Sequence, residues 1–181
     1  MAYTYLEAVE QLKILLSDGK ESVETLEKLI ADTSAKIPQA GPDSIYLLYS
    51  GDTDDVKGVE TATNISNNKK NALVIADTPV GMLLNNEDFK LAYFIAQRDE
   101  YRATIPGFAE LSKNEQWEIL KRANSLAFNG TDASGKRVTS DSLWDQASKR
   151  YVEEATGSFR ILATNASEFS IFYQTELPVL L

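Results

Sequence analysis

The apolar residues of the first forty positions recur every three or four residues, which is the repeat of an α-helix. Leucine, valine and isoleucine keep this spacing on both sides of a break at Asp18 and Gly19, and the pattern ends at Pro38. Residues at this spacing lie on one face of a helix. The pattern therefore predicts two consecutive helices that form an antiparallel pair or an arm.

Shorter apolar runs follow, and their length and their aliphatic and aromatic content favour buried strands. The runs are SIYLLYS at residues 44–50, ALVIAD at 72–77 and FRILA at 159–163. The first two are each followed by a typical helix start, at the acidic turn 52–55 and at Thr78. Because strand, turn and helix repeat in this way, the pattern predicts an α/β fold in which helices cover a small parallel sheet.

Helical patterns dominate the remainder of the chain. Residues 86–128 carry two of them, separated near Pro106. A further helix is expected to begin at the caps Ser142 and Asp145 and to end at Gly157. Helices are thus expected to form most of the second half of the chain.

Polar and turn-forming residues predict loops at 64–71 and 129–142, and the second loop is expected to be exposed and mobile. The closing segment FSIFYQTELPVLL is expected to be extended. We expect a single domain with an all-helical lobe and a sheet lobe. The helical lobe comprises about residues 1–43 and 86–128, and the sheet lobe about residues 44–85 and 142–181.

The amino-acid composition limits the chemistry. The 181 residues include no histidine and no cysteine, which excludes imidazole bases, thiolate nucleophiles and soft metal ligands. Carboxylate, hydroxyl, amine and aromatic groups remain, and we expect no metal site. A reaction that needs no proton donor and only requires stabilisation of a cation would suit this set of groups.

The charge of the chain limits its partners. A net charge of −9 and a pI near 4.6 disfavour nucleic acids and anionic membrane surfaces, and a basic protein is the better electrostatic match. No apolar run approaches the length of a membrane span. The first residues also lack the basic start and apolar centre of a signal peptide.

One carboxy-terminal segment carries a distinctive order of residues. Trp144 is followed after three residues by Ser148, then by a Lys-Arg-Tyr run, and Glu176 follows an aromatic run further on. This segment resembles the catalytic half of the ADP-ribosyl cyclase and NAD glycohydrolase family, which cleaves the bond between nicotinamide and ribose. YLLYSG at 46–51 and DTPVGMLL at 77–84 resemble two further family segments in the same order.

The resemblance implies roles for three residues. Glu176 takes the place of the family's catalytic glutamate, which holds the ribose hydroxyls and stabilises the cation left when nicotinamide departs. Trp144 would stack on nicotinamide, and Ser148, one helical turn further on, would meet the same ligand. The fold implied is ADP-ribosyl cyclase-like, with a cleft at the carboxyl ends of the parallel strands.

The resemblance also implies further substrate contacts, and it departs from the family at three points. The substrate-binding residues implied are Tyr49, Ser50, Gly51, Asp77, Thr78 and Phe172. Ala76 stands at the family's second acidic position, with Asp77 beside it as a substitute. Gly51 replaces a basic residue that contacts phosphate, and the disulfides of the animal members are missing because the chain has no cysteine.

The function implied is that of an NAD(P)⁺ glycohydrolase or ADP-ribosyl cyclase, for which NAD(P)⁺ is the substrate and no cofactor is needed. Cysteine-free relatives resemble the effector domains of bacterial toxins. This likeness implies a secreted or delivered, NAD-depleting effector that acts in the target-cell cytoplasm and is held by a cognate immunity protein. The residues themselves leave two alternatives: a non-enzymatic interaction protein, or a module that binds a nucleotide without consuming it.

Overall fold

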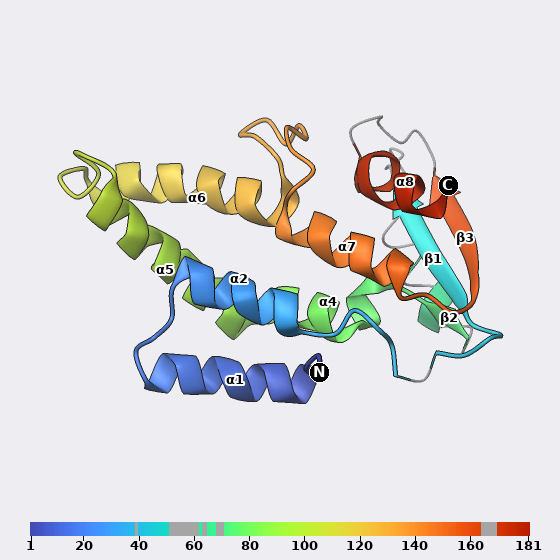
Figure 1. Cartoon of the computed structure of the whole chain (residues 1–181). Coiled ribbons are helices and arrows are strands. Elements are labelled where there is room, and N and C mark those ends of the chain that lie inside the picture. The colour runs from blue at the N-terminus through green and yellow to red at the C-terminus, as the bar shows by residue number, and fades with distance from the viewer. Residues whose placement is uncertain (39, 51–61, 63–64, 68–70, 164–169) are drawn as a thin grey trace.

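A small parallel sheet stands at one end of the molecule, and helices make up most of the rest (Figure 1). The computed structural model describes residues 1–38, 40–50, 62, 65–67, 71–163 and 170–181. The sheet has three strands in the order β2-β1-β3. The strands are β1 (Ile45–Ser50), β2 (Ala72–Leu73) and β3 (Ser158–Ala163). The predicted α/β class with a small parallel sheet is confirmed.

The central strand β1 pairs with both of the other strands. It pairs in parallel with β3 from Ile45↔Ser158 to Ser50↔Ala163, and with β2 at only two positions. Tyr46, Leu47 and Leu48 are buried on both of its faces, as expected for a strand covered by helices on either side.

The strand predicted over 72–77 is shorter than expected. It ends at Leu73, and the 3₁₀-helix η1 (Ile75–Asp77) follows. The hydroxyl and the amide of Thr78 both donate to the carbonyl of Ile75. A local turn therefore uses this carbonyl, which a longer β2 would need for pairing with a neighbouring strand. The local turn therefore ends the ladder early.

The two predicted amino-terminal helices are confirmed as α1 (Tyr5–Ser17) and α2 (Val23–Asp32), but α2 ends before the predicted limit at Pro38, where Thr33 turns extended and forms an isolated parallel bridge with Tyr3. Each begins with a capping box, at Thr4 with Glu7 and at Ser22 with Thr25. Figure 1 shows the two helices side by side and running in opposite directions, so they form the antiparallel pair.

The remaining long helices also follow the predicted pattern. They are α5 (Glu87–Thr104), α6 (Lys113–Asn129) and α7 (Leu143–Glu153), and the short α4 (Pro79–Leu84) precedes them. Their apolar residues join those of α1, α2 and β1 in one continuous core. The Tyr93 and Phe128 rings pack edge to face with centroids 5.1 Å apart. This one core includes residues of both predicted lobes. The division into two lobes stays a prediction.

The carboxy-terminal segment is helical, so the prediction that it is extended was wrong. Phe172–Glu176 forms the π-helix η2, and Leu177–Leu180 forms α8, which packs against η2 and α7. Leu177 and Leu180 pack against the core at helical spacing, and Pro178 fits the first turn of a helix. The segment packs against α7 through both η2 and α8, and against β1 through η2.

Two other predicted segments have mixed outcomes. Residues 65–67 are helical, so the loop predicted over 64–71 is wrong there. Asn129 still belongs to α6, and the rest of the loop predicted over 129–142 is confirmed as mostly exposed, with an isolated antiparallel bridge between Thr131 and Arg137. The helix start predicted at 52–55 lies outside the described residues. In the ranges described, no helix has both the length and the hydropathy needed to cross a membrane.

The entry into β3 leads to a stability prediction. A Cβ at Gly157 would overlap the backbone carbonyl of Ser44, whereas a Cβ at Gly41 would meet nothing within 4 Å. We expect Gly157→Ala to lower the free energy of unfolding by about 1–3 kcal/mol, because β3 must shift away from β1. Gly41→Ala should stay within about 0.5 kcal/mol of the wild type. Urea unfolding of both variants measures this, and equal stabilities would contradict it.

Candidate functional site

A cavity of about 290 Å³ lies between α7, the carboxy-terminal segment and the turn after β2. The three residues predicted to be catalytic, Trp144, Ser148 and Glu176, all line it. Ile75 and Ala76 follow β2 directly, so the cavity borders the carboxyl end of that strand. The structure thus brings together groups that come from separate parts of the chain.

Helix α7 positions two of these residues through local rules. The capping box of Ser142 and Asp145 begins the helix at Leu143, as predicted. Trp144 and Ser148 are four residues apart, so their side chains lie on the same face. The Tyr151 hydroxyl, one turn beyond Ser148 on this same face, donates to the carbonyl of Leu73 over 3.0 Å and so holds α7 against β2.

Arg150 belongs to the same motif, but its contacts lie away from the cavity. Its guanidinium donates to the carbonyls of Ile30 and Thr33, at 2.8 Å each, at the end of α2. Burial lowers the pKa of Arg150 from its usual value. This residue fixes α7 to α2 and leaves the ligand contacts to the other face of the helix.

Glu176 reaches the cavity from the end of η2. Its side chain is only 5% exposed, and burial raises the pKa of its carboxyl group to about 7. A hydrogen bond from the Ser148 hydroxyl acts against this rise, and the nearby charge of Asp145 adds to it. The Oε2 atom is buried, and no donor among the described residues reaches it. A buried carboxylate oxygen without a partner is costly and is a common feature of functional sites.

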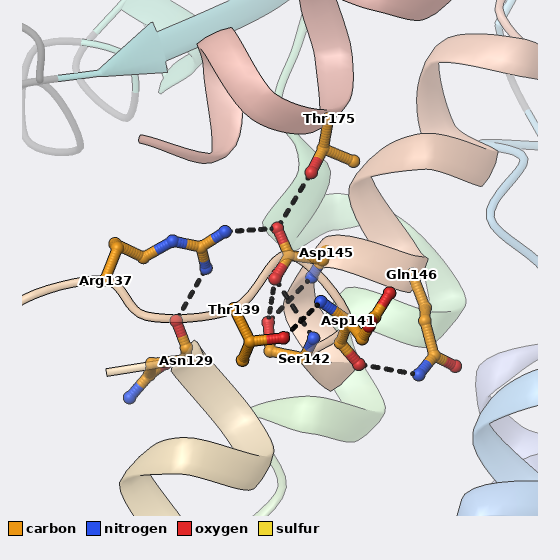
Figure 2. A network of polar contacts seen from close by, with 8 residues as sticks. All are labelled: Asn129, Arg137, Thr139, Asp141, Ser142, Asp145, Gln146 and Thr175. Atoms are coloured by element: carbon orange, nitrogen blue, oxygen red, sulfur yellow. Dashed lines mark hydrogen bonds and ion pairs between the residues drawn. The ribbon is translucent and has the colours of Figure 1, made fainter. Parts of the chain in front are cut away.

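Asp145 is the centre of a polar network that sequence reasoning recognised only as a helix cap (Figure 2). Its Oδ1 accepts from the Arg137 guanidinium at 2.6 Å and from the Thr175 hydroxyl at 2.9 Å. Its Oδ2 accepts from the Ser142 hydroxyl at 2.6 Å and from the Ser142 amide at 3.1 Å. The side chain is 1% exposed, so the buried charge is fully engaged.

Two predicted substrate contacts do not line this cavity. Thr78 is buried as the cap of α4, where its hydroxyl donates to the Ile75 carbonyl and accepts from the Gly81 amide. Asp77 is exposed and accepts a hydrogen bond from the Ser66 hydroxyl at 3.2 Å. Both hold the turn after β2, and its neighbour Ala76 lines the cavity instead.

Four other predicted contacts fall wholly or partly outside the described residues. The backbones of Tyr49 and Ser50 pair with Leu162 and Ala163 at the end of β1. The side chains of Tyr49, Ser50 and Phe172 lie outside the described residues, as does the whole of Gly51. Their substrate contacts stay predictions.

Sequence reasoning missed two polar residues of the cavity wall. Asn85 comes from the C-cap of α4, and Asn129 is the last residue of α6. Leu47 and Ile171 add apolar surface. The two asparagines lie at the ends of different helices, so no sequence spacing connects them. An indole ring, a hydroxyl, a carboxyl group and amides in a partly apolar cavity suit a small polar organic ligand.

A larger hollow of about 470 Å³ lies between α2 and α5. Its acidic lining residues are Glu21, Glu24, Glu27, Asp99 and Glu100. This concentration of negative charge would repel an anionic dinucleotide, so the smaller cavity is the better candidate site despite its size. Within the part of the chain that the structure describes, no cluster of three or more acidic side chains has a geometry that could hold a metal ion.

Comparison with models of protein families, with curated proteins and with solved structures finds no match for this chain.

The buried carboxyl group of Glu176 makes stability depend on pH. Its pKa is about 7 in the folded chain and 4.5 in the ordinary exposed state, so between these values only the folded chain keeps the proton. Stability should therefore fall as pH rises from about 4.5 to 7. Because each pH unit in this window is worth about 1.4 kcal/mol, Glu176→Gln should be more stable than the wild type at pH 8 by on the order of 3 kcal/mol.

At pH 4 the two proteins should have nearly the same stability, since both carry a neutral side chain there. Urea unfolding at pH 4, 6 and 8 measures the difference, and Glu10→Gln on the exposed surface of α1 controls for the change in net charge. A stability difference that does not change with pH would contradict the burial of this carboxyl group.

Proposed function

We propose that this chain is an NAD(P)⁺ glycohydrolase or ADP-ribosyl cyclase with an ADP-ribosyl cyclase-like fold. The observation that supports the proposal is the meeting of Trp144, Ser148 and Glu176 in one cavity. The family resemblance singled out these three residues from sequence order alone, and the last of them comes from a different element from the other two.

In the proposed reaction, nicotinamide stacks on the Trp144 indole and the ribose hydroxyls donate hydrogen bonds to the Glu176 carboxylate. The bond between ribose C1′ and the pyridinium nitrogen breaks, and its electron pair stays on nicotinamide, which leaves as a neutral molecule. Water then bonds to C1′ and loses a proton to give ADP-ribose. Attack by an adenine ring nitrogen instead gives cyclic ADP-ribose.

The surroundings of Glu176 suit this role. A carboxylate in a poorly hydrated site interacts strongly with a developing cation, because little water screens the two charges. The positive pyridinium ring of the substrate would itself favour the ionised carboxylate when it binds. The Oε2 atom, which no donor among the described residues reaches, then accepts hydrogen bonds from the ribose hydroxyls.

The biological role that we propose is that of an NAD-depleting bacterial effector. It would be secreted or delivered into a target cell, act in the cytoplasm and be held inactive by a cognate immunity protein. This part of the proposal rests on the resemblance to cysteine-free toxin domains. The net charge of −9 supports a basic binding surface on the immunity protein.

Nicotinamide release tests the reaction directly. The purified chain should release nicotinamide from NAD⁺ or NADP⁺, and Glu176→Gln should reduce the rate roughly 10²- to 10³-fold because the variant has no charge to stabilise the cation. Exposed Glu153→Gln, on the same helix as Trp144, is the matched control and should keep the wild-type rate.

If neither the wild type nor Glu176→Gln releases nicotinamide at high protein concentration, the enzymatic proposal is overturned. A rise in melting temperature with NAD⁺ but without turnover would then favour a nucleotide-binding module. Neither binding nor turnover would favour an interaction protein.

The raised pKa of Glu176 also predicts a pH profile for the enzyme. Since the ionised form is required, kcat/KM should rise roughly tenfold per pH unit below 7 and level off above it. Steady-state rates from pH 5 to 9 measure this, because kcat/KM reports the pKa of the free enzyme. A flat profile over this range would mean that another group carries the charge.

A further inference from the structure

Two consecutive residues of η2 contact two residues that lie one turn apart on α7. Thr175 donates its hydroxyl to Asp145, and Glu176 accepts from the Ser148 hydroxyl. Asp145 and Ser148 are three residues apart, so they share the side of the helix that faces η2. The carboxy-terminal segment is therefore attached to α7 at two neighbouring points, one of which is the candidate catalytic glutamate.

We propose that Asp145 is a positioning residue for Glu176 and that it acts through the Thr175 hydroxyl. Thr175 is 8% exposed, so its bond to Asp145 is shielded from competing water. Sequence similarity assigned no role of this kind, since Asp145 was recognised only as a helix cap and Thr175 as part of an extended segment.

The carboxy-terminal segment needs such an attachment. The π-helix η2 has five residues and α8 has four, and helices of this length are not stable by themselves in water. Their placement must come from contacts with the rest of the fold. Thr175 gives a directional contact next to Glu176, whereas the apolar side chains of Leu177 and Leu180 hold the segment without fixing its rotation.

Asp145 is suited to be the fixed end of this contact. Ser142 holds one carboxylate oxygen from the start of α7, and Arg137 holds the other from the preceding loop (Figure 2). The Arg137 guanidinium also donates to the backbone carbonyl of Asn129 at 2.6 Å, at the end of α6. Since Asn129 lines the cavity, the same network also contacts a second part of the cavity wall.

Two substitutions at Thr175 separate positioning from packing. Thr175→Val keeps the shape of the side chain and removes the donor, whereas Thr175→Ser keeps the donor and removes a methyl group. Thr139→Val is the matched control, because the Thr139 hydroxyl accepts from the Asp141 amide and makes no bond to Asp145 in Figure 2. None of these variants removes a group that we place in contact with the substrate.

The first measurement does not depend on activity. The titration of the Glu176 carboxyl is followed by carbon-13 NMR of glutamate-labelled protein, and its signal is assigned by its loss in Glu176→Gln. The midpoint should be about 7 in the wild type, in Thr175→Ser and in Thr139→Val. In Thr175→Val it should fall towards 4.5, because a displaced Glu176 becomes solvated while Asp145 and Ser148, the charged and polar groups of α7 that face it, stay in place.

The second measurement is nicotinamide release, and this arm alone rests on the proposed function. Thr175→Val should lower kcat on the order of 10- to 100-fold with a smaller change in KM, as expected when a reacting group is misplaced. Thr175→Ser should restore most of the wild-type rate. The Thr139→Val rate should match the wild type.

The outcomes distinguish the two proposals. If the wild type releases no nicotinamide but the NMR midpoint moves in Thr175→Val and not in Thr175→Ser, the proposed function fails and the positioning role stands. If the midpoint in Thr175→Val equals that of the wild type, or if Thr139→Val moves it equally, the positioning role is overturned. A wild-type midpoint near 4.5 would overturn it as well, because Glu176 would then not be held in a buried position.

Discussion

The buried carboxylate of Asp145 connects four parts of the chain around the candidate site. It joins the start of α7, the loop that carries Arg137, the end of α6 through that arginine, and the carboxy-terminal segment through Thr175. Removing a charge from water is costly, and the cost is met only when its oxygens are well bonded. Because four donors engage Asp145, the arrangement holds only while all these segments keep their positions, and the cavity depends on that arrangement.

Glu176 is also a buried acid, but it has fewer hydrogen-bond partners than Asp145. Asp145 has a counter-charge and four donors, whereas Glu176 has the Ser148 hydroxyl on one side and, on the other, an oxygen that no donor in the described parts of the chain reaches. An unsatisfied buried group lowers stability, and this oxygen could accept a hydrogen bond from a ligand in the cavity. In a chain without histidine or cysteine, the poorly solvated Glu176 carboxylate beside the Trp144 indole is the group that we propose to stabilise a cation.

Local patterns predicted much of the fold. The helices of the amino-terminal pair, α5, α6 and α7 follow from apolar spacing and capping residues, and β1 and β3 follow from short apolar runs. The failures have tertiary causes. ALVIAD forms only a short strand because Thr78 turns the chain at Ile75, and FSIFYQTELPVLL is largely helical and packs against α7 through η2 and α8. An apolar run indicates that a segment is buried, but the segments that pack against it determine whether it forms a strand or a helix.

For the site, sequence determined those relations that lie within one helical turn. The spacing of Trp144 and Ser148 places both on one face of α7, and the spacing of Ser142 and Asp145 makes a capping box, whatever the rest of the chain does. Only the tertiary structure decided that Glu176 enters the same cavity, that Asn85 and Asn129 line it, and that Thr175 reaches Asp145. Spacing along a helix is set by backbone geometry, whereas contacts between distant segments depend on how those segments pack against a shared core.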